Sequence, residues 1–134
     1  MKKFNLKPFA VIIIFLTGLA IISGSMGKRV LLSMDKNPHK DDIADSEARG
    51  LALYESNCTR CHGSSGTGDG PEAETIGKRP PNLISYINRR KVNSLVYTTI
   101  YGKGKFMPAF QSTLSNDQIW DIGNYIVSLK PKAQ

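Results

Sequence analysis

A chain of 134 residues has room for one ordinary domain with additions at its ends, but not for two ordinary domains. Its formal net charge is +7, and its two cysteines allow at most one disulfide, which excludes a domain held together by several disulfides. Fewer than 90 residues follow position 45. A domain of that size has difficulty burying enough apolar surface unless it also binds a metal or a large cofactor.

Residues 1–27 are predicted to be a membrane anchor or a signal peptide. Three lysines precede residues 8–27, which carry no charge. A helix of that length reaches about 30 Å, roughly the thickness of the hydrocarbon layer, whereas the most apolar part, residues 9–22, is closer in length to the core of a signal peptide. We expect an uncleaved single-pass anchor, or a periplasmic protein if the segment is cleaved. Both alternatives send the rest of the chain across the membrane.

Residues 28–45 carry many charges and show no sustained periodicity, so we predict a flexible linker there. A helix is expected over residues 46–57, capped by Asp45 or Ser46. Within a helix, a glycine such as Gly50 costs up to about 1 kcal/mol against alanine. Its presence therefore indicates that another helix approaches closely at this point.

Two further helices are expected toward the C-terminus. Residues 94–101 form a short helix that stops at Gly102. In the last helix, Ser115 and Gln118 fit a capping box, and apolar residues then recur at helical spacing until Pro131. No segment alternates as a strand does, so the predicted class is all-α, small and rich in loops.

The sequence CTRCH holds both cysteines, Cys58 and Cys61, followed directly by His62. C-x-x-C-H is the attachment motif of c-type haem. Each thiol can bond to one vinyl group of the porphyrin, which holds the histidine beneath the ring as an iron ligand. Two alternatives lack support: a thioredoxin-like disulfide needs a strand–helix–strand setting, and a zinc site needs a second ligand pair.

The iron of haem has a second axial position, for which methionine and histidine are strong candidates. His39 lies in the predicted linker, where we expect it to be solvated. Met107 is the one methionine in residues 46–134, and it sits in the sequence KFMPAF, between a glycine-rich turn and Pro108. Such a loop can present a side chain inward. We therefore predict that His62 and Met107 are the two iron ligands.

With these motifs in place, residues 46–129 resemble a class I bacterial cytochrome c. The resemblance rests on GLALYESNCTRCHG, GDG, PPNL, KFMPAF and LSNDQIWDIGNYIVSL, taken together. It implies the small cytochrome c fold, in which helices wrap around one covalent haem. It also implies that the first and last helices cross, with these residues at the crossing: Gly50, Tyr54, Ile122 and Tyr125.

The resemblance further implies that the Pro81 carbonyl accepts a hydrogen bond from the second ring nitrogen of His62. The adjacent Pro80 is the alternative acceptor. Such an acceptor fixes the orientation of the imidazole. Ligation by His62 and Met107 fills both axial positions, so we predict a one-electron carrier and not an enzyme. Two alternatives stay open: a haem c subunit of a larger oxidoreductase, and a haem ligand sensor or peroxidase-like protein in which Met107 leaves the iron.

The charges indicate the kind of partner. Residues 46–134 hold 11 lysines and arginines against seven acidic residues. Lys103 and Lys105 flank the predicted ligand loop and would steer an acidic docking surface, whereas the basic run from Arg89 to Lys91 is equally consistent with an ordinary solvated face. We expect membrane redox complexes as electron donor and acceptor, and no nucleic acid. The haem domain, residues 46–134, is expected on the outer face of the cytoplasmic membrane.

Overall fold

The computed structural model describes residues 36–131, which make up most of Asn37–Gln134, the second of two compact units in the chain. The predicted membrane anchor or signal peptide, and the linker up to residue 35, lie outside the described residues. Within the described part of the chain, no helix is both long and apolar enough to cross a membrane.

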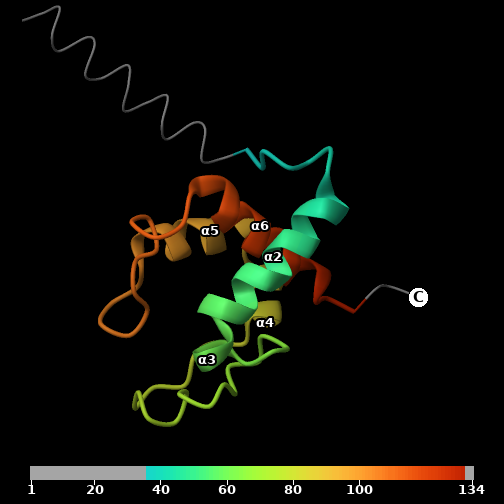
Figure 1. Ribbon diagram of the computed structural model, residues 1–134. Helices are drawn as coiled ribbons and strands as arrows, with labels where there is room; N and C mark the ends of the chain where they lie inside the picture. Colours follow the sequence, from blue (N-terminus) through green and yellow to red (C-terminus); the bar gives the residue numbers. More distant parts are fainter. Residues whose placement is uncertain (1–35, 132–134) are drawn as a thin grey trace, which may run out of the picture. The chain divides into compact units, whose positions relative to one another are not determined.

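Five helices make up the regular structure of residues 36–131, and no strand occurs among them (Figure 1). They are α2 (Ile43–Asn57), α3 (Thr59–His62), α4 (Leu83–Arg89), α5 (Val92–Tyr101) and α6 (Asn116–Ser128). The only β geometry in this range is an isolated bridge between Lys103 and Met107. The predicted all-α class is therefore confirmed.

The first helix begins earlier than the sequence indicates. α2 starts at Ile43 and not at residue 46, so the predicted cap at Asp45 or Ser46 is wrong. The segment just before the helix, residues 37–42, was predicted as flexible linker, but part of it contacts α6. The side-chain amide of Asn37 donates a hydrogen bond to Oδ1 of Asn124 at 2.8 Å.

Asp121, in the middle of α6, explains how this segment is held. It is only 3% exposed and accepts hydrogen bonds from Ser46 Oγ at 2.6 Å and from Arg49 Nε at 2.9 Å. Bonds to Asp121, and then to Asp42, raise the pKa of Arg49. The expectation that His39 is solvated is wrong, because its side chain is 16% exposed and its Nε2 lies 3.4 Å from Asp121 Oδ1. The buried carboxylate is thus compensated by Ser46 and Arg49 of α2, and His39 of the preceding segment packs beside it.

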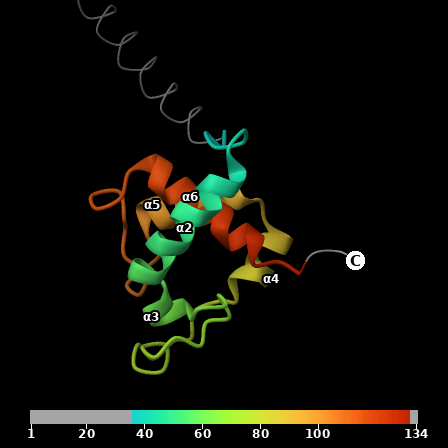
Figure 2. The ribbon, with the colours of Figure 1, turned by 45° about the vertical axis from the view of Figure 1, so that its right-hand side comes forward.

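α2 and α6 cross, as both views show (Figures 1 and 2). Gly50 lies at the crossing, where an added Cβ would overlap the backbone carbonyl of Asp121 and come within 2.9 Å of Tyr125 Cβ. The rings of Tyr54 and Tyr125 pack with their centroids 5.2 Å apart, and Ile122 belongs to the same buried cluster as Tyr54. The expected reason for a glycine inside this helix is therefore confirmed.

The remaining helices pack on this pair. α5 lies against α6 where Gly123 leaves room for two valines, since an added Cβ would lie 3.2 Å from Val96 and 3.3 Å from Val92. The capping box of α6 is confirmed, with Ser115 and Gln118 bonded in both directions. No helix was expected at α4, whose residues follow the Pro80–Pro81 pair. Buried side chains from α2, α4, α5 and α6 form one core cluster: Tyr54, Leu83, Ile87, Leu95, Ile122 and Ile126.

Candidate functional site

The CTRCH sequence forms one helical turn at the end of α2. Cys58 closes α2, with its backbone N–H bonded to the Tyr54 carbonyl at 2.8 Å, and it also serves as the N-cap of α3. The backbone N–H of His62 then donates to the Cys58 carbonyl at 2.9 Å. Residues three and four apart on a helix share a face. The turn therefore brings Cys58, Cys61 and His62 together, and both cysteines are free of any disulfide.

The environment of Cys58 is apolar. Burial raises the pKa of its thiol to about 12, and the neighbouring Cys61 adds to this effect. Reactive redox cysteines and zinc ligands act as thiolates, which a positive or polar environment favours. This environment does not favour the thiolate form. Addition to a vinyl group of haem leaves a neutral thioether, which suits an apolar setting.

The environment of His62 favours the neutral form of its imidazole. Burial lowers the pKa of His62, and the Pro81 carbonyl beside the ring opposes this shift in part. The Nδ1 atom is buried and makes no hydrogen bond of regular geometry with the described residues. A neutral imidazole is the form that binds iron. A buried imidazole with one unpaired nitrogen beside a carbonyl is therefore what a ligating histidine of haem requires, so these residues fit the group.

The backbone carbonyls of the cysteine turn and of Gly63 accept hydrogen bonds that hold the turn in place. Gly68 N donates to the His62 carbonyl at 2.8 Å, and Gly70 N donates to the Cys61 carbonyl at 3.3 Å. The hydroxyl of Tyr54 donates to the Gly63 carbonyl at 2.7 Å. At Gly70 an added Cβ would meet the Arg60 carbonyl at 2.5 Å, which explains why the run after the cysteines is rich in glycine. The role of the Tyr54 hydroxyl has no signal in the sequence pattern, in which Tyr54 is expected only as a packing residue at the helix crossing.

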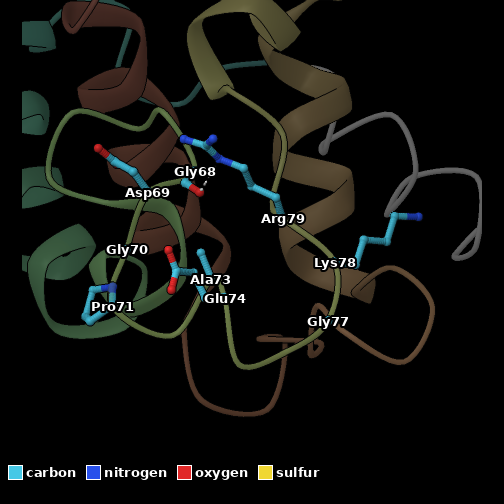
Figure 3. A pocket seen from close by; sticks show the side chains of 9 residues that line it. All are labelled: Gly68, Asp69, Gly70, Pro71, Ala73, Glu74, Gly77, Lys78 and Arg79. Carbon is cyan, nitrogen blue, oxygen red and sulfur yellow. Dashed lines mark hydrogen bonds between the residues drawn. The ribbon is translucent and has the colours of Figure 1, made fainter.

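The loop that follows the turn surrounds an open hollow of about 680 Å³ (Figure 3). Its lining residues are Gly68, Asp69, Gly70, Pro71, Ala73, Glu74, Gly77, Lys78 and Arg79. Apart from Ala73 these residues are glycine, proline or charged, and no cysteine, histidine or methionine lines the hollow. We therefore place the predicted haem chemistry at the cysteine turn and not in this hollow.

Met107 lies on a different element, in the loop between α5 and α6, and is half-buried. Lys103 N donates to the Met107 carbonyl at 2.9 Å, which forms the isolated bridge. Gly102 adopts a φ of 73°, and an added Cβ there would lie 2.9 Å from the backbone of Pro108 and of Ala109. The loop that carries Met107 therefore has a backbone fixed by its own contacts.

Comparison with known proteins agrees with this geometry. Residues 45–126 match the family described as cytochrome c oxidase, cbb3-type, subunit III. The chain is also 35% identical over 89 residues to cytochrome c6 of Leptolyngbya boryana, and the alignment covers 66% of this chain and 98% of that relative. The chain therefore belongs to the cytochrome c family, as a class I monohaem member that carries covalently bound haem c and transfers electrons.

Proposed function

We propose that the chain is a one-electron carrier whose haem c is bonded to Cys58 and Cys61, with His62 and Met107 as the axial ligands of its iron. The bound haem supplies an iron that accepts and releases one electron. One observation supports this proposal most: the two thiols and the His62 imidazole share a single turn, the ring has a buried Nδ1 without a hydrogen-bond partner, and the Pro81 carbonyl lies beside the ring. Pro81 then accepts from that nitrogen and orients the imidazole.

The argument for Met107 rests on its loop. It is the one methionine among residues 36–131, and the hydrogen bond to Lys103 fixes its backbone. A thioether is a weak donor, so ligation by methionine in place of a second histidine raises the reduction potential. With both axial positions filled, the iron has no open position for a substrate. These properties suit electron transfer better than catalysis.

Optical spectra of the haem-loaded protein test the ligands. We expect the wild type to be low-spin, with the weak long-wavelength band of sulfur ligation in the oxidised form. Met107→Ala should lose this band and bind carbon monoxide rapidly when reduced. Met107→His is the matched variant: it should stay low-spin without the band and have a lower reduction potential. A high-spin wild type would refute the proposal and favour the ligand sensor or peroxidase-like alternative.

A location follows from the predicted organisation of the chain. We infer that residues 1–27 tether the haem domain to the outer face of the cytoplasmic membrane, or direct it to the periplasm if they are cleaved. Asn37 and the residues after it belong with the haem domain, because the Asn37 side chain bonds to Asn124 of α6. Such a carrier exchanges electrons with membrane redox complexes. Fractionation of cells that express the full chain, with and without an alkaline wash, separates the two alternatives.

Lys103 and Lys105 are the residues we expect to face an acidic partner. Both are exposed, and the Nζ of Lys105 lies 5.1 Å from the ring centroid of the exposed Phe106. Reversing both charges to glutamate should slow electron transfer to isolated membranes at low salt and leave the rate at high salt unchanged, because exposed charges are screened. Arg89→Glu with Lys91→Glu is the control at the second basic cluster. Equal slowing by both double variants would contradict a specific role for the Met107 loop.

A second candidate is a permanent haem subunit of a larger oxidoreductase. The match to the family described as subunit III of cbb3-type oxidase favours it. A tagged chain purified in mild detergent decides between the two. Recovery in a stable stoichiometric complex supports a subunit, and recovery alone with rapid exchange of electrons supports a mobile carrier.

A further inference from the structure

The loop between the His62 turn and α4 has no packed interior. It surrounds the hollow of about 680 Å³, and among the residues that line the hollow only Ala73 is a buried apolar side chain. Most of a protein's packing stability comes from buried apolar surface. The hydrogen bonds where its two limbs meet therefore contribute to keeping the loop closed, together with the packing of Leu83 in the core.

The loop has two limbs: the first runs through Gly66 and Gly68, and the second runs from Arg79 to Leu83. They lie against each other beside the hollow, and we call this contact the neck. Leu83 N donates to the Gly66 carbonyl at 2.8 Å, and Arg79 Nε donates to the Gly68 carbonyl at 3.1 Å. Figure 3 shows Arg79 reaching back across the neck to Gly68. An added Cβ at Gly68 would overlap the carbonyl of Pro80, so the two backbones are in direct contact.

The positive charge of Arg79 also acts on a neighbouring carboxylate of the first limb. Figure 3 shows its guanidinium at the same edge of the hollow as the carboxylate of Asp69. The Thr67 hydroxyl is the main cause of the lowered pKa of Asp69, and the positive charge of Arg79 adds to it. The guanidinium thus bonds to the Gly68 carbonyl on the first limb, and its charge acts on Asp69 without a direct bond.

The second limb carries Pro81, whose carbonyl lies beside the His62 ring. We propose that Arg79 is a positioning residue: its hydrogen bond to Gly68 closes the neck and holds the Pro81 carbonyl against the ring nitrogen of His62. This inference rests on the proposed ligation of haem iron by His62. A histidine that donates to a carbonyl is a more basic ligand and stabilises ferric iron. Closure of the neck therefore lowers the reduction potential.

Reduction potentials of the haem-loaded full chain test this role, because loss of the bond and loss of charge act in opposite directions. Removing a positive charge near the iron favours the ferric state and lowers the potential. Opening the neck raises it. Arg79→Lys keeps the charge but cannot place a donor where Nε lies, and Lys78→Met removes a charge from the next residue, also on the lining of the hollow. We expect a higher potential in Arg79→Lys and no increase in Lys78→Met.

An unchanged potential in Arg79→Lys would overturn the proposal, since only charge would then matter. If Arg79→Lys does not retain haem, the wild type is measured directly by following exchange of the His62 ring N–H with solvent. Exchange at the rate of a free imidazole overturns the proposal. Slow exchange supports it only if exchange is faster in Arg79→Met, and equal rates in the two proteins overturn it. A wild-type spectrum without histidine ligation would overturn the proposed function itself, which distinguishes the two failures.

Discussion

Replacing Gly50 by alanine tests the crossing of α2 and α6. In an exposed helix, alanine is more stable than glycine by about 1 kcal/mol. At this position the new methyl group would overlap the Asp121 carbonyl and lie 2.9 Å from Tyr125 Cβ. Overpacking of a tight core costs about 1–3 kcal/mol, and backbone is less able to give way than a flexible side chain. Taking about 2–3 kcal/mol for the overlap, we expect Gly50→Ala to lose about 1–2 kcal/mol net.

That loss lowers the melting temperature by about 4–15 °C in a domain of this size. The assay is thermal unfolding of the haem-loaded protein followed by far-ultraviolet circular dichroism. Ala48→Gly, at an exposed position of α2, is the matched control for helix propensity alone. Helix propensity alone predicts that Gly50→Ala raises the melting temperature and that Ala48→Gly lowers it. The close crossing of the helices predicts that both variants lower it. A Gly50→Ala variant as stable as the wild type would refute the close approach of the helices.

Two other changes test the site and the segment before α2. Tyr54→Phe removes the hydrogen bond to Gly63 and should cost about 1 kcal/mol in denaturant unfolding at neutral pH. Burial raises the pKa of Tyr54 above its unfolded value of about 10, so the wild type should lose stability as the pH rises above about 10, and Tyr54→Phe should lose less. Asp121→Asn weakens the bonds to Ser46 and Arg49, so amides of residues 37–46 should exchange faster with solvent. Asp117→Asn, exposed on the same helix, should leave that exchange unchanged, and equal rates in the two variants would count against the role of Asp121.

The candidate site was predictable to the extent that it is local in the chain. Cys58, Cys61 and His62 lie within five consecutive positions, so one helical turn is enough to bring them together. Pro81 and Met107 lie on other elements, and their roles toward the iron stay predictions. Arg79 gave no signal in the sequence, because its role depends on where the second limb of the loop runs and not on any motif.

The amino-acid sequence by itself determined the all-α class, the position of the cysteine turn and the capping box of α6. Each depends on residues within a few positions of one another, where backbone hydrogen bonding and helical spacing decide the outcome. Only the tertiary structure decided that α2 begins at Ile43 and that His39 is largely buried. The first turn of α2 and His39 both contact Asp121, which is 75 residues from its partner Ser46. A buried carboxylate is stable only when hydrogen-bonding or charged partners lie beside it in the folded protein. Local sequence patterns do not predict contacts between residues that are so far apart in the chain.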